Sequence, residues 1–371
     1  MPAPGMPMSS AANRSTPSPA TDRSTRVVIV GAGPIGIELA VALQRAGIAF
    51  EMFDAGSIGQ TISWWAPQTR WFSSNERIAI AGVPLQTVDQ TKATREQYLN
   101  YLRSVVTQFG LRIHTHTPVL DIQRGEDTMT VITGGQQVRQ RWRCREVVLA
   151  IGGTDFPRKL EIPGEDLPHV DGYLRETHRY FGRRVLIIGG RNSAIEAALR
   201  LHHAGAQVSI SYRGEELPVD GIKYWLLPEM LGLLKAGRIG NHLGTVPVEI
   251  TPQSVKLRSI NDDSAPLRDV PADDVLSLIG YEQEKSLFRA AGVELVDTSQ
   301  RPTHDPVTMQ TNIPGIYVAG TAVAGTQNSK YKTFLENCHD HVDRIVAHLS
   351  GTAPESVDPE YMKQVAAQPE S

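Results

Sequence analysis

Two short apolar runs set the pattern of this chain, and each has the same surroundings. Val27–Val30 and Val185–Ile188 have the length and β-branched content of strands that are buried on both faces. Glycines follow each run, and apolar residues at helical spacing come next, over Ile37–Leu43 and over Ile195–His203. The pattern therefore predicts two strand–turn–helix units in an α/β protein.

Alternating and helical patterns predict the other elements. A helix is expected over residues 94–109, an irregular one with a break over 222–228, and a C-terminal helix over about 331–349. Strands are expected over 111–114, 119–123, 129–133, 137–142, 146–151, 207–211, 248–250, 254–257 and 270–279, with a hairpin turn at 134–135 and a further turn and strand over 313–320.

The first turn has the spacing of a dinucleotide-binding motif. Gly31, Gly33 and Gly36 form a G-x-G-x-x-G turn between strand and helix. Gly31 permits the tight turn, Gly33 leaves room for a pyrophosphate, and Gly36 lets the helix pack closely on the strand. Asp54 ends the next strand 23 residues after Gly31 (54 − 31), where a carboxylate binds ribose hydroxyls. The alternative, an ordinary glycine-rich turn, is disfavoured by this context.

The segment after Asp54 has glycines and aromatic residues but no helical period. Ala55–Trp65 is therefore expected to be a loop beyond the second strand that passes near the cofactor. Trp64 and Trp65 either contact a ligand there or pack into the protein, and the sequence leaves both alternatives open.

The second turn is a weaker version of the first. Gly189 and Gly190 begin it, but Arg191 stands where the middle glycine belongs, and Asn192 and Ser193 then lead into the helix. Alone this turn would be ambiguous. Paired with the first unit, it predicts a second nucleotide site at these five residues.

The strand after the second turn ends without an acid. Ser211 lies 22 residues after Gly189 (211 − 189), and Tyr212 and Arg213 follow it. A 2′-phosphate binds a cation and is repelled by a carboxylate, so this strand end favours NADPH over NADH. The alternative is that Arg213 is a solvated surface charge.

Composition excludes several classes of protein. The chain has 371 residues, 40% of them hydrophobic and 21% charged, and a net charge of −3, which gives no sign of nucleic-acid binding. No apolar run is long enough to span a membrane. Met1–Ser24 and residues 351–371 are expected to be disordered tails because of their polar, Pro- and Ser-rich composition.

The cysteines and histidines indicate neither a disulfide framework nor a metal site. The chain has two cysteines, Cys144 and Cys338, and no C-x-x-C pair, which fits a reducing cytoplasm. The histidines lack the spacing of metal ligands.

The combination of two such units resembles the thioredoxin-reductase-like flavoproteins. Its general marks are the opening glycine turn, Ala150–Gly152, Ile162–Gly164 and Pro314–Gly320. This resemblance implies two Rossmann-like three-layer dinucleotide-binding domains, with the NADPH domain inserted into the FAD domain. The expected bounds are 25–165 with 283–350 for the FAD-binding domain and 166–282 for the NADPH-binding domain.

Finer segments resemble the YpdA-type bacillithiol-disulfide reductases over about residues 26–350. They are Phe72–Ser74, Ile188–Ser193, Tyr212–Gly214, Ile222–Pro228 and Phe334–Asn337. The resemblance implies NADPH-dependent reduction, through FAD, of a small-molecule disulfide or a redox protein, in an assembly of two or four copies. The residues expected to bind FAD are Gly31, Gly33, Pro34, Ile35, Gly36, Asp54, Ala55, Gln60, Thr61, Trp65, Val119, Gly152 and Gly320.

The chain departs from that family at one position. Members typically carry a cysteine between the Pro and the last Gly of the first turn, and Ile35 stands there. Cys338, early in the C-terminal helix that approaches the flavin in such folds, is the candidate catalytic thiol. A buried, inert Cys338 is the preferred alternative. Cys144, at the start of a strand, is expected to be structural.

Other functions stay open beside the disulfide reductase. An NADPH–flavin reductase for ferredoxin or flavodoxin would need no cysteine. A flavin monooxygenase is weaker, because its F-x-G-x-x-x-H motif is incomplete: Gly172 and His178 are six apart (178 − 172), without a preceding Phe. A redox sensor or binding module gains weight from the missing thiols, but two nucleotide units in one chain argue against it.

Overall fold

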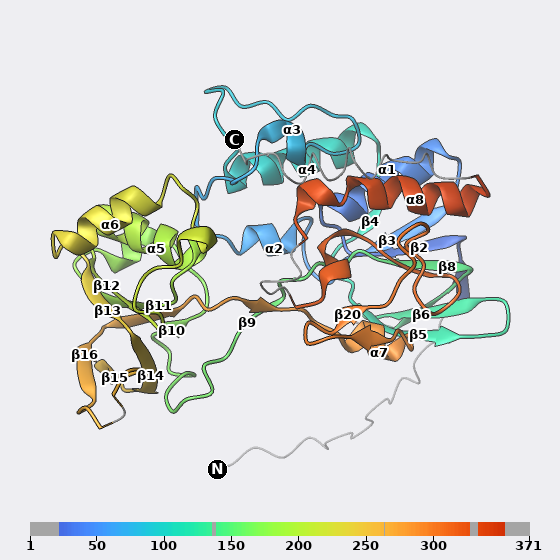
Figure 1. Cartoon of the computed structure of the whole chain (residues 1–371). Helices are drawn as coiled ribbons and strands as arrows, with labels where there is room; N and C mark the ends of the chain where they lie inside the picture. Colours follow the sequence, from blue (N-terminus) through green and yellow to red (C-terminus); the bar gives the residue numbers. More distant parts are fainter. Residues whose placement is uncertain (1–21, 136–138, 263, 327–332, 353–371) are drawn as a thin grey trace, which may run out of the picture.

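Two separate five-stranded parallel sheets organise the molecule, each inside its own lobe (Figure 1). The computed structural model describes residues 22–135, 139–262, 264–326 and 333–352. The first lobe is built from the residues before 156 and after 282, and the second lobe from residues 158–280. This is the mixed α/β fold that the two apolar runs predict.

The first run forms the central strand of the first sheet. The strand order is β21-β8-β2-β3-β4, and all pairings are parallel. The strands are β2 (Val27–Val30), β3 (Phe50–Phe53), β4 (Ile113–His114), β8 (Glu146–Leu149) and β21 (Ile316–Val318). All residues of β2 are buried, as a continuous apolar run requires. Because β21 follows the second lobe in sequence, the chain returns to complete the first sheet.

Helices cover one face of this sheet, and a smaller sheet lies beyond the other (Figure 1). The helices are α1 (Pro34–Arg45), α4 (Arg95–Gln108) and α8 (His339–Ser350), with the short α2 (Gln60–Ser63), α3 (Asn75–Ile78) and α7 (Ser286–Ala290) elsewhere in the lobe. The smaller sheet has the order β1-β7-β6-β5, with β1 (Asp22–Ser24), β5 (Val119–Arg124), β6 (Met129–Thr133) and β7 (Gln140–Cys144).

The second run, within β11, is the central strand of the second sheet, whose order is β10-β17-β11-β12-β13. The strands are β10 (Val170–Asp171), β11 (Arg184–Ile188), β12 (Gln207–Tyr212), β13 (Gly240–Leu243) and β17 (Asp274–Ser277). The helices α5 (Asn192–His203) and α6 (Leu227–Lys235) and an antiparallel sheet of β14 (Thr245–Ile250), β15 (Ser254–Ser259) and β16 (Arg268–Pro271) complete the lobe.

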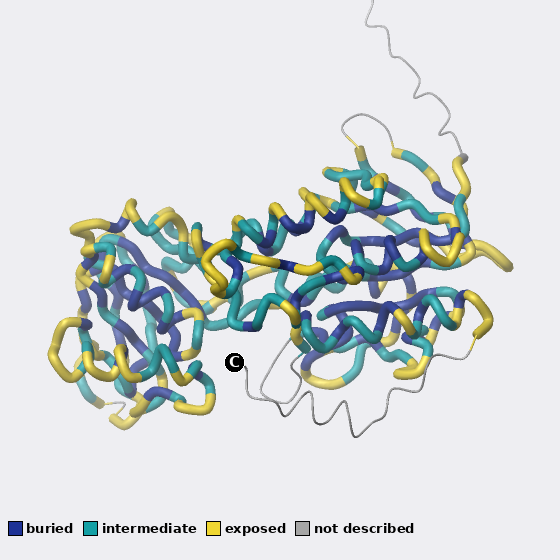
Figure 2. Tube along the Cα trace, turned by 90° about the horizontal axis from the view of Figure 1, so that it is seen from above, coloured by how far each residue is buried: buried dark blue, intermediate teal, exposed yellow. Residues whose placement is uncertain are grey.

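The chain crosses between the lobes twice, along one two-stranded ribbon. β9 (Phe156–Pro157) leads out of the first lobe and pairs antiparallel with β18 (Tyr281–Glu282), which leads back. Buried residues concentrate inside each lobe, on either side of this crossing (Figure 2).

Several expected boundaries were wrong. Asp22–Ser24, assigned to the tail, pairs in parallel with Arg141–Arg143. The strand expected over 270–279 is two strands, because the chain leaves the antiparallel sheet at Pro271 and enters the parallel sheet at Asp274. The C-terminal helix begins at His339, after a short 3-10 turn. Parts of the expected helix and hairpin, residues 331–332 and 136–138, lie outside the described residues.

Candidate functional site

The first glycine turn is built as the motif predicts. Gly31 has a φ of 109°, and a Cβ there would lie 2.3 Å from the Ala150 carbonyl oxygen. A Cβ on Gly36 would lie 2.1 Å from the Gly31 oxygen, so helix and turn touch at their backbones. A Cβ on Gly33 would have no atom within 4 Å. The turn is therefore tight on two sides and open at Gly33, as a pyrophosphate site requires.

The open side coincides with the start of α1. Gly33 is the N-cap, and no side chain caps the helix there. Pro34 has no N–H, and the first backbone bond of the helix is donated by Ile37 to Gly33. The N–H groups of Ile35 and Gly36 lie in the first turn, where an anion is favoured by free donors and by the helix dipole.

Asp54 holds the glycine turn in place. Its Oδ2 accepts from the N–H of Ala32 at 2.6 Å, and its Oδ1 accepts from the N–H of Gly56 at 2.7 Å. Burial raises the pKa of this carboxyl, and the two backbone donors only partly offset that effect. Each oxygen can accept a second hydrogen bond, so the ribose contact stays a prediction.

The loop after Asp54 lies beside the turn but is not wholly irregular. It contains the short helix α2, and Gly59 donates to the Ala32 oxygen at 3.0 Å. Gln60 accepts from the N–H of Ser57, whereas Thr61 and Trp65 line a cavity described below. Ala55 lies between Asp54 and Gly56 in this turn.

Val119 is buried at the start of β5. Two residues before it, the backbone N–H of Thr117 donates to the backbone oxygen of Asp54.

Gly152 and Gly320 belong to loops that one buried side chain joins. Both have positive φ angles, 82° and 72°. The Gln283 Nε2 donates to the Gly152 oxygen at 2.8 Å and to the Ala322 oxygen at 2.9 Å. Gly320 itself donates to Nδ1 of His341 at 3.2 Å. Gln283 was missed in the sequence, because a single polar residue in a loop carries no periodic signal.

The second glycine turn repeats the construction of the first. Gly189 has a φ of 140°, and a Cβ there would lie 2.5 Å from the Leu278 oxygen. A Cβ on Gly190 would lie 2.5 Å from the ring of Tyr212, which therefore packs on the turn. Arg191 is the N-cap of α5, without a capping side chain, and its exposed side chain lies along Gly221.

Residues at the end of β12 divide into exposed and buried ones. Arg213 is exposed. Ser211 is fully buried, and its hydroxyl lies 2.9 Å from that of Thr245. The Ser211 side chain is therefore committed to the protein, and any contact from this position would have to use the backbone.

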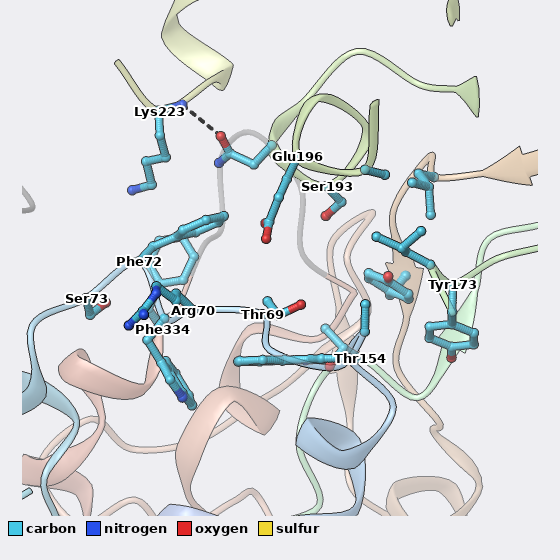
Figure 3. A pocket seen from close by; sticks show the side chains of 18 of the residues that line it. Thr69, Arg70, Phe72, Ser73, Thr154, Tyr173, Ser193, Glu196, Lys223 and Phe334 are labelled. Atoms are coloured by element: carbon cyan, nitrogen blue, oxygen red, sulfur yellow. Dashed lines mark hydrogen bonds between the residues drawn. The ribbon is translucent and has the colours of Figure 1, made fainter. Parts of the chain in front are cut away.

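A cavity of about 580 Å³ is lined by residues of both lobes. Thr61, Trp65 and Thr69 of the first lobe line one side, and Asn192 and Ser193 at the start of α5 line the other. Figure 3 shows Ser193 and Glu196 pointing from α5 into this cavity, toward the side of Thr69 and Thr154.

Glu196 and Arg200 of α5 were missed in the sequence, although their spacing from the predicted Asn192 gives a signal. Asn192, Glu196 and Arg200 recur every four residues on a helix whose other face is apolar. Arg200 lies 3.8 Å from Glu196 and donates across the lobes to the Thr69 hydroxyl at 2.6 Å. Burial raises the pKa of Glu196, and Arg200 only partly offsets it. The helix thus contributes Glu196 and Arg200 to the charged side chains of the cavity, beside Arg70, Lys223 and Glu336.

Aromatic residues from both lobes form the cavity walls. Trp64 meets Tyr173 edge to face at 5.9 Å between ring centroids, and Tyr173 stacks on Tyr281 at 5.5 Å. On another side, Phe72 contacts Trp225 at 6.1 Å. Trp65 packs on Trp71 at 4.8 Å and also lines the cavity, so it packs into the protein, and its contact with a ligand stays a prediction.

Cys338 is a poor candidate for a reactive thiol. It is the N-cap residue of α8, is fully buried, and donates to the Phe334 oxygen at 3.1 Å. Burial raises its pKa well above the usual range, and nearby acids raise it further. The structure therefore argues against the catalytic assignment and for the inert alternative, because the thiolate is the reactive form.

Two glycine turns of the dinucleotide-binding form, one in each lobe, together with a cavity lined by both lobes, are typical of an oxidoreductase that uses two nucleotide cofactors. The family model described as pyridine nucleotide-disulphide oxidoreductase matches residues 28–320. The chain therefore belongs to the pyridine nucleotide-disulphide oxidoreductase family. It is an FAD- and NADPH-dependent thiol–disulfide reductase by class.

Individual relatives confirm the resemblance to the YpdA-type reductases. The chain is 32% identical over 325 residues to the bacilliredoxin reductase Bdr of Bacillus subtilis (strain 168), which covers 88% of this chain and 97% of that protein. The structure of the bacillithiol disulfide reductase Bdr (YpdA) from Bacillus cereus matches with a TM-score of 0.83 at 32% identity, over 89% of this chain and 99% of that one. The thioredoxin reductase of T. acidophilum shares the fold, with a TM-score of 0.68 at 18% identity, over 89% of this chain and 98% of that one.

The described ranges contain neither a membrane-spanning helix nor a cluster of metal ligands. No helix there is both long and apolar enough to cross a membrane. In the same ranges, no group of three or more His, Cys, Asp or Glu side chains is arranged to hold a metal ion.

Proposed function

We propose that this chain reduces the disulfide of a low-molecular-weight thiol with electrons from NADPH. The observation that carries the proposal is the shared cavity, which the segment from Thr61 to Ser73 lines from the first lobe and the start of α5 lines from the second. The relatives from Bacillus point to bacillithiol disulfide as the first acceptor to test. The net reaction is NADPH + H⁺ + RSSR → NADP⁺ + 2 RSH.

FAD is proposed to bind in the first lobe. The open space at Gly33 and the uncapped start of α1 fit a pyrophosphate, and Asp54 fits a ribose. When bound, FAD supplies the chemistry that accepts a hydride from NADPH and passes two electrons on. Gln283 joins the loops at Gly152 and Gly320, and these loops would hold the flavin ring of FAD beside the cavity.

NADPH is proposed to bind in the second lobe. The uncapped N-terminus of α5, with Asn192 and Ser193 in its first turn, fits the pyrophosphate. Arg191 is the N-cap of α5, Arg213 directly follows β12, and both are exposed, so they would bind the 2′-phosphate. We also propose the domain bounds 25–165 with 283–350 and 166–282, which follow the membership of the two sheets closely.

The residues around the cavity have separate tasks. The rings of Trp64, Tyr173 and Phe72 would exclude water from the reacting groups. Arg200 sets the distance between α5 and the first lobe through Thr69. Glu196 points into the cavity and holds a proton more tightly than an ordinary carboxyl.

The proposal is tested with the purified full chain loaded with FAD. NADPH oxidation is followed with bacillithiol disulfide, glutathione disulfide and cystine, and the thiols formed are counted. We expect two thiols for each NADPH with at least one of these acceptors. Turnover with a ferredoxin or a flavodoxin, and with none of the disulfides, would overturn the proposal in favour of an electron-transfer reductase.

A further inference from the structure

Both cysteines of the 371-residue sequence are enclosed by the protein. Cys144 on β7 is 2% exposed, and its Sγ lies 3.9 Å from the Met129 oxygen. Cys338 has no exposed surface, and its Sγ donates to the Phe334 oxygen. Since the sequence contains no third cysteine, none of its thiols is presented to an acceptor in the cavity.

The surroundings of both thiols oppose ionisation. Burial raises the pKa of Cys144 to about 12, and the charge of Glu146 adds to this. Burial raises the pKa of Cys338 as well, and Asp340, Glu336 and Glu38 add to the shift. A reactive cysteine needs the opposite environment, which is a neighbouring cation or a free helix N-terminus that stabilises the thiolate.

The imidazole next to Cys338 does not change this. His339 lies with Nδ1 2.7 Å from Glu38 Oε2 and with Nε2 3.0 Å from the Arg77 oxygen. Both ring nitrogens are committed to these acceptors, so His339 cannot take a proton from the thiol. Cys338 therefore has no base to activate it.

A hydrocarbon side chain occupies the start of α1. Ile35 is 5% exposed and faces the loop of Gly320, where a Cβ would lie 3.4 Å from the Ile35 Cβ. This part of the site is therefore filled by an inert side chain. The described residues that line the cavity likewise include no cysteine.

From these observations we propose that the enzyme reduces its acceptor without any covalent bond between the acceptor and a protein sulfur. The inference rests on the proposed function and concerns how the acceptor S–S bond is broken. The two electrons and the proton of the NADPH hydride, with one proton from solvent, appear in two free thiols. No mixed disulfide with the protein forms, and no protein disulfide is opened or closed.

A double variant tests this directly. Cys144→Ala combined with Cys338→Ala removes both thiols from the full chain, and each change removes a single buried sulfur atom. With NADPH and the small disulfide 5,5′-dithiobis(2-nitrobenzoate), we expect a kcat within about twofold of the wild-type value, a change below about 0.4 kcal/mol. A kcat that falls to background, in a variant that keeps the wild-type flavin spectrum, would overturn the inference.

A second measurement needs no variant and therefore does not depend on the double variant folding. The wild-type enzyme is quenched with acid during turnover, and its intact mass is recorded. We expect the unmodified mass, and we expect iodoacetamide to leave the activity of the native enzyme unchanged. A mass increase equal to one thiol of the acceptor, bound to either cysteine as a mixed disulfide, would contradict the inference. Inactivation by iodoacetamide that the acceptor prevents would contradict it as well.

Failure of the proposed function gives a different result. A wild-type enzyme that oxidises NADPH with menadione but with no disulfide would refute the disulfide-reductase proposal. The unmodified mass and the insensitivity to iodoacetamide would still support electron transfer without a protein thiol in that case.

Discussion

Arg200 Nη1 lies 2.6 Å from the Thr69 hydroxyl oxygen and thereby joins α5 of the second lobe to a loop of the first. The other terminal nitrogen of Arg200 donates to the Pro67 oxygen in the same loop. Both acceptors lie across the cavity from the helix. One guanidinium group therefore sets how closely the second glycine turn approaches the first lobe.

Replacing Arg200 tests this role. Arg200→Ala should lower kcat/KM with NADPH about 10-fold, because losing a charge-assisted hydrogen bond costs roughly 1.5–3 kcal/mol. Steady-state kinetics measure the change. Arg238→Ala, at an exposed turn remote from the cavity lining, is the matched control and should leave kcat/KM unchanged. Equal values for the Arg200 variant and wild type would show that the contact does not set the geometry of the cavity.

The first glycine turn gives a contrast between two alanine substitutions. Gly31→Ala places a Cβ 2.3 Å from the Ala150 oxygen at a φ of 109°, so this variant should be destabilised by more than about 3 kcal/mol. Gly33→Ala meets no atom within 4 Å and should keep the melting temperature of the FAD-free protein.

The same pair of variants tests the cofactor site. Gly33→Ala should weaken FAD binding at least about 10-fold, because the added methyl group occupies space left for the pyrophosphate. Equilibrium titration of the FAD-free variant with FAD measures this. An unchanged dissociation constant would place the pyrophosphate away from Gly33.

Arg213 should decide the choice of nucleotide. Arg213→Ala should raise KM for NADPH about 10-fold and leave KM for NADH unchanged, because only NADPH carries the 2′-phosphate. The ratio of the two kcat/KM values measures the effect. If the KM values for NADPH and NADH rise together, Arg213 contacts a group that both nucleotides carry and not the 2′-phosphate. Arg213 would then give no support to the preference for NADPH.

His339 should make stability depend on pH. Burial lowers its pKa, but the hydrogen bond and charge of Glu38 and the Arg77 carbonyl outweigh burial, and the net pKa is raised. The protonated ring therefore stabilises the fold below the unfolded pKa of about 6.5, and this contribution is lost as pH rises through the folded value.

The measurement compares urea unfolding of His339→Gln and wild type at about pH 5.5 and pH 9. We expect the variant to lose about 1–2 kcal/mol at the lower pH and less at the higher one. His203→Gln, whose ring meets Glu229 on the exposed surface, is the control and should change stability by less than about 0.5 kcal/mol. A His339 variant with the same loss at both pH values would contradict a charged ring.

Local features of the sequence predicted the two glycine turns well. The turn glycines directly follow the apolar strands, and Asp54 ends the next strand at the spacing of the motif, so local sequence and spacing place them. The cavity could not be predicted in this way, because Thr69 and Arg200 meet only after two sheets have formed and the chain has crossed between lobes. Exposure of Ser211 and Cys338 likewise depends on tertiary packing, and both side chains turned out to be buried.

One boundary failed where a change of sheet falls inside a stretch that was expected to be a single strand. Within residues 270–279, Val270 belongs to the antiparallel sheet and Val275 to the parallel one, and the change falls at the polar pair Asp273 and Asp274. The C-terminal helix was expected too early for a similar reason. Leu335 belongs to a 3-10 turn that the helical spacing of α8 does not distinguish.

An anaerobic titration of the purified, FAD-loaded protein tests the central claim most directly. NADPH is added until the visible flavin absorption is bleached, and bacillithiol disulfide is then added without oxygen. The account predicts complete bleaching by one equivalent of NADPH, recovery of the absorption with the disulfide, and two thiols released for each flavin. A flavin that NADPH bleaches but no disulfide restores, while ferredoxin or oxygen does, would contradict the account.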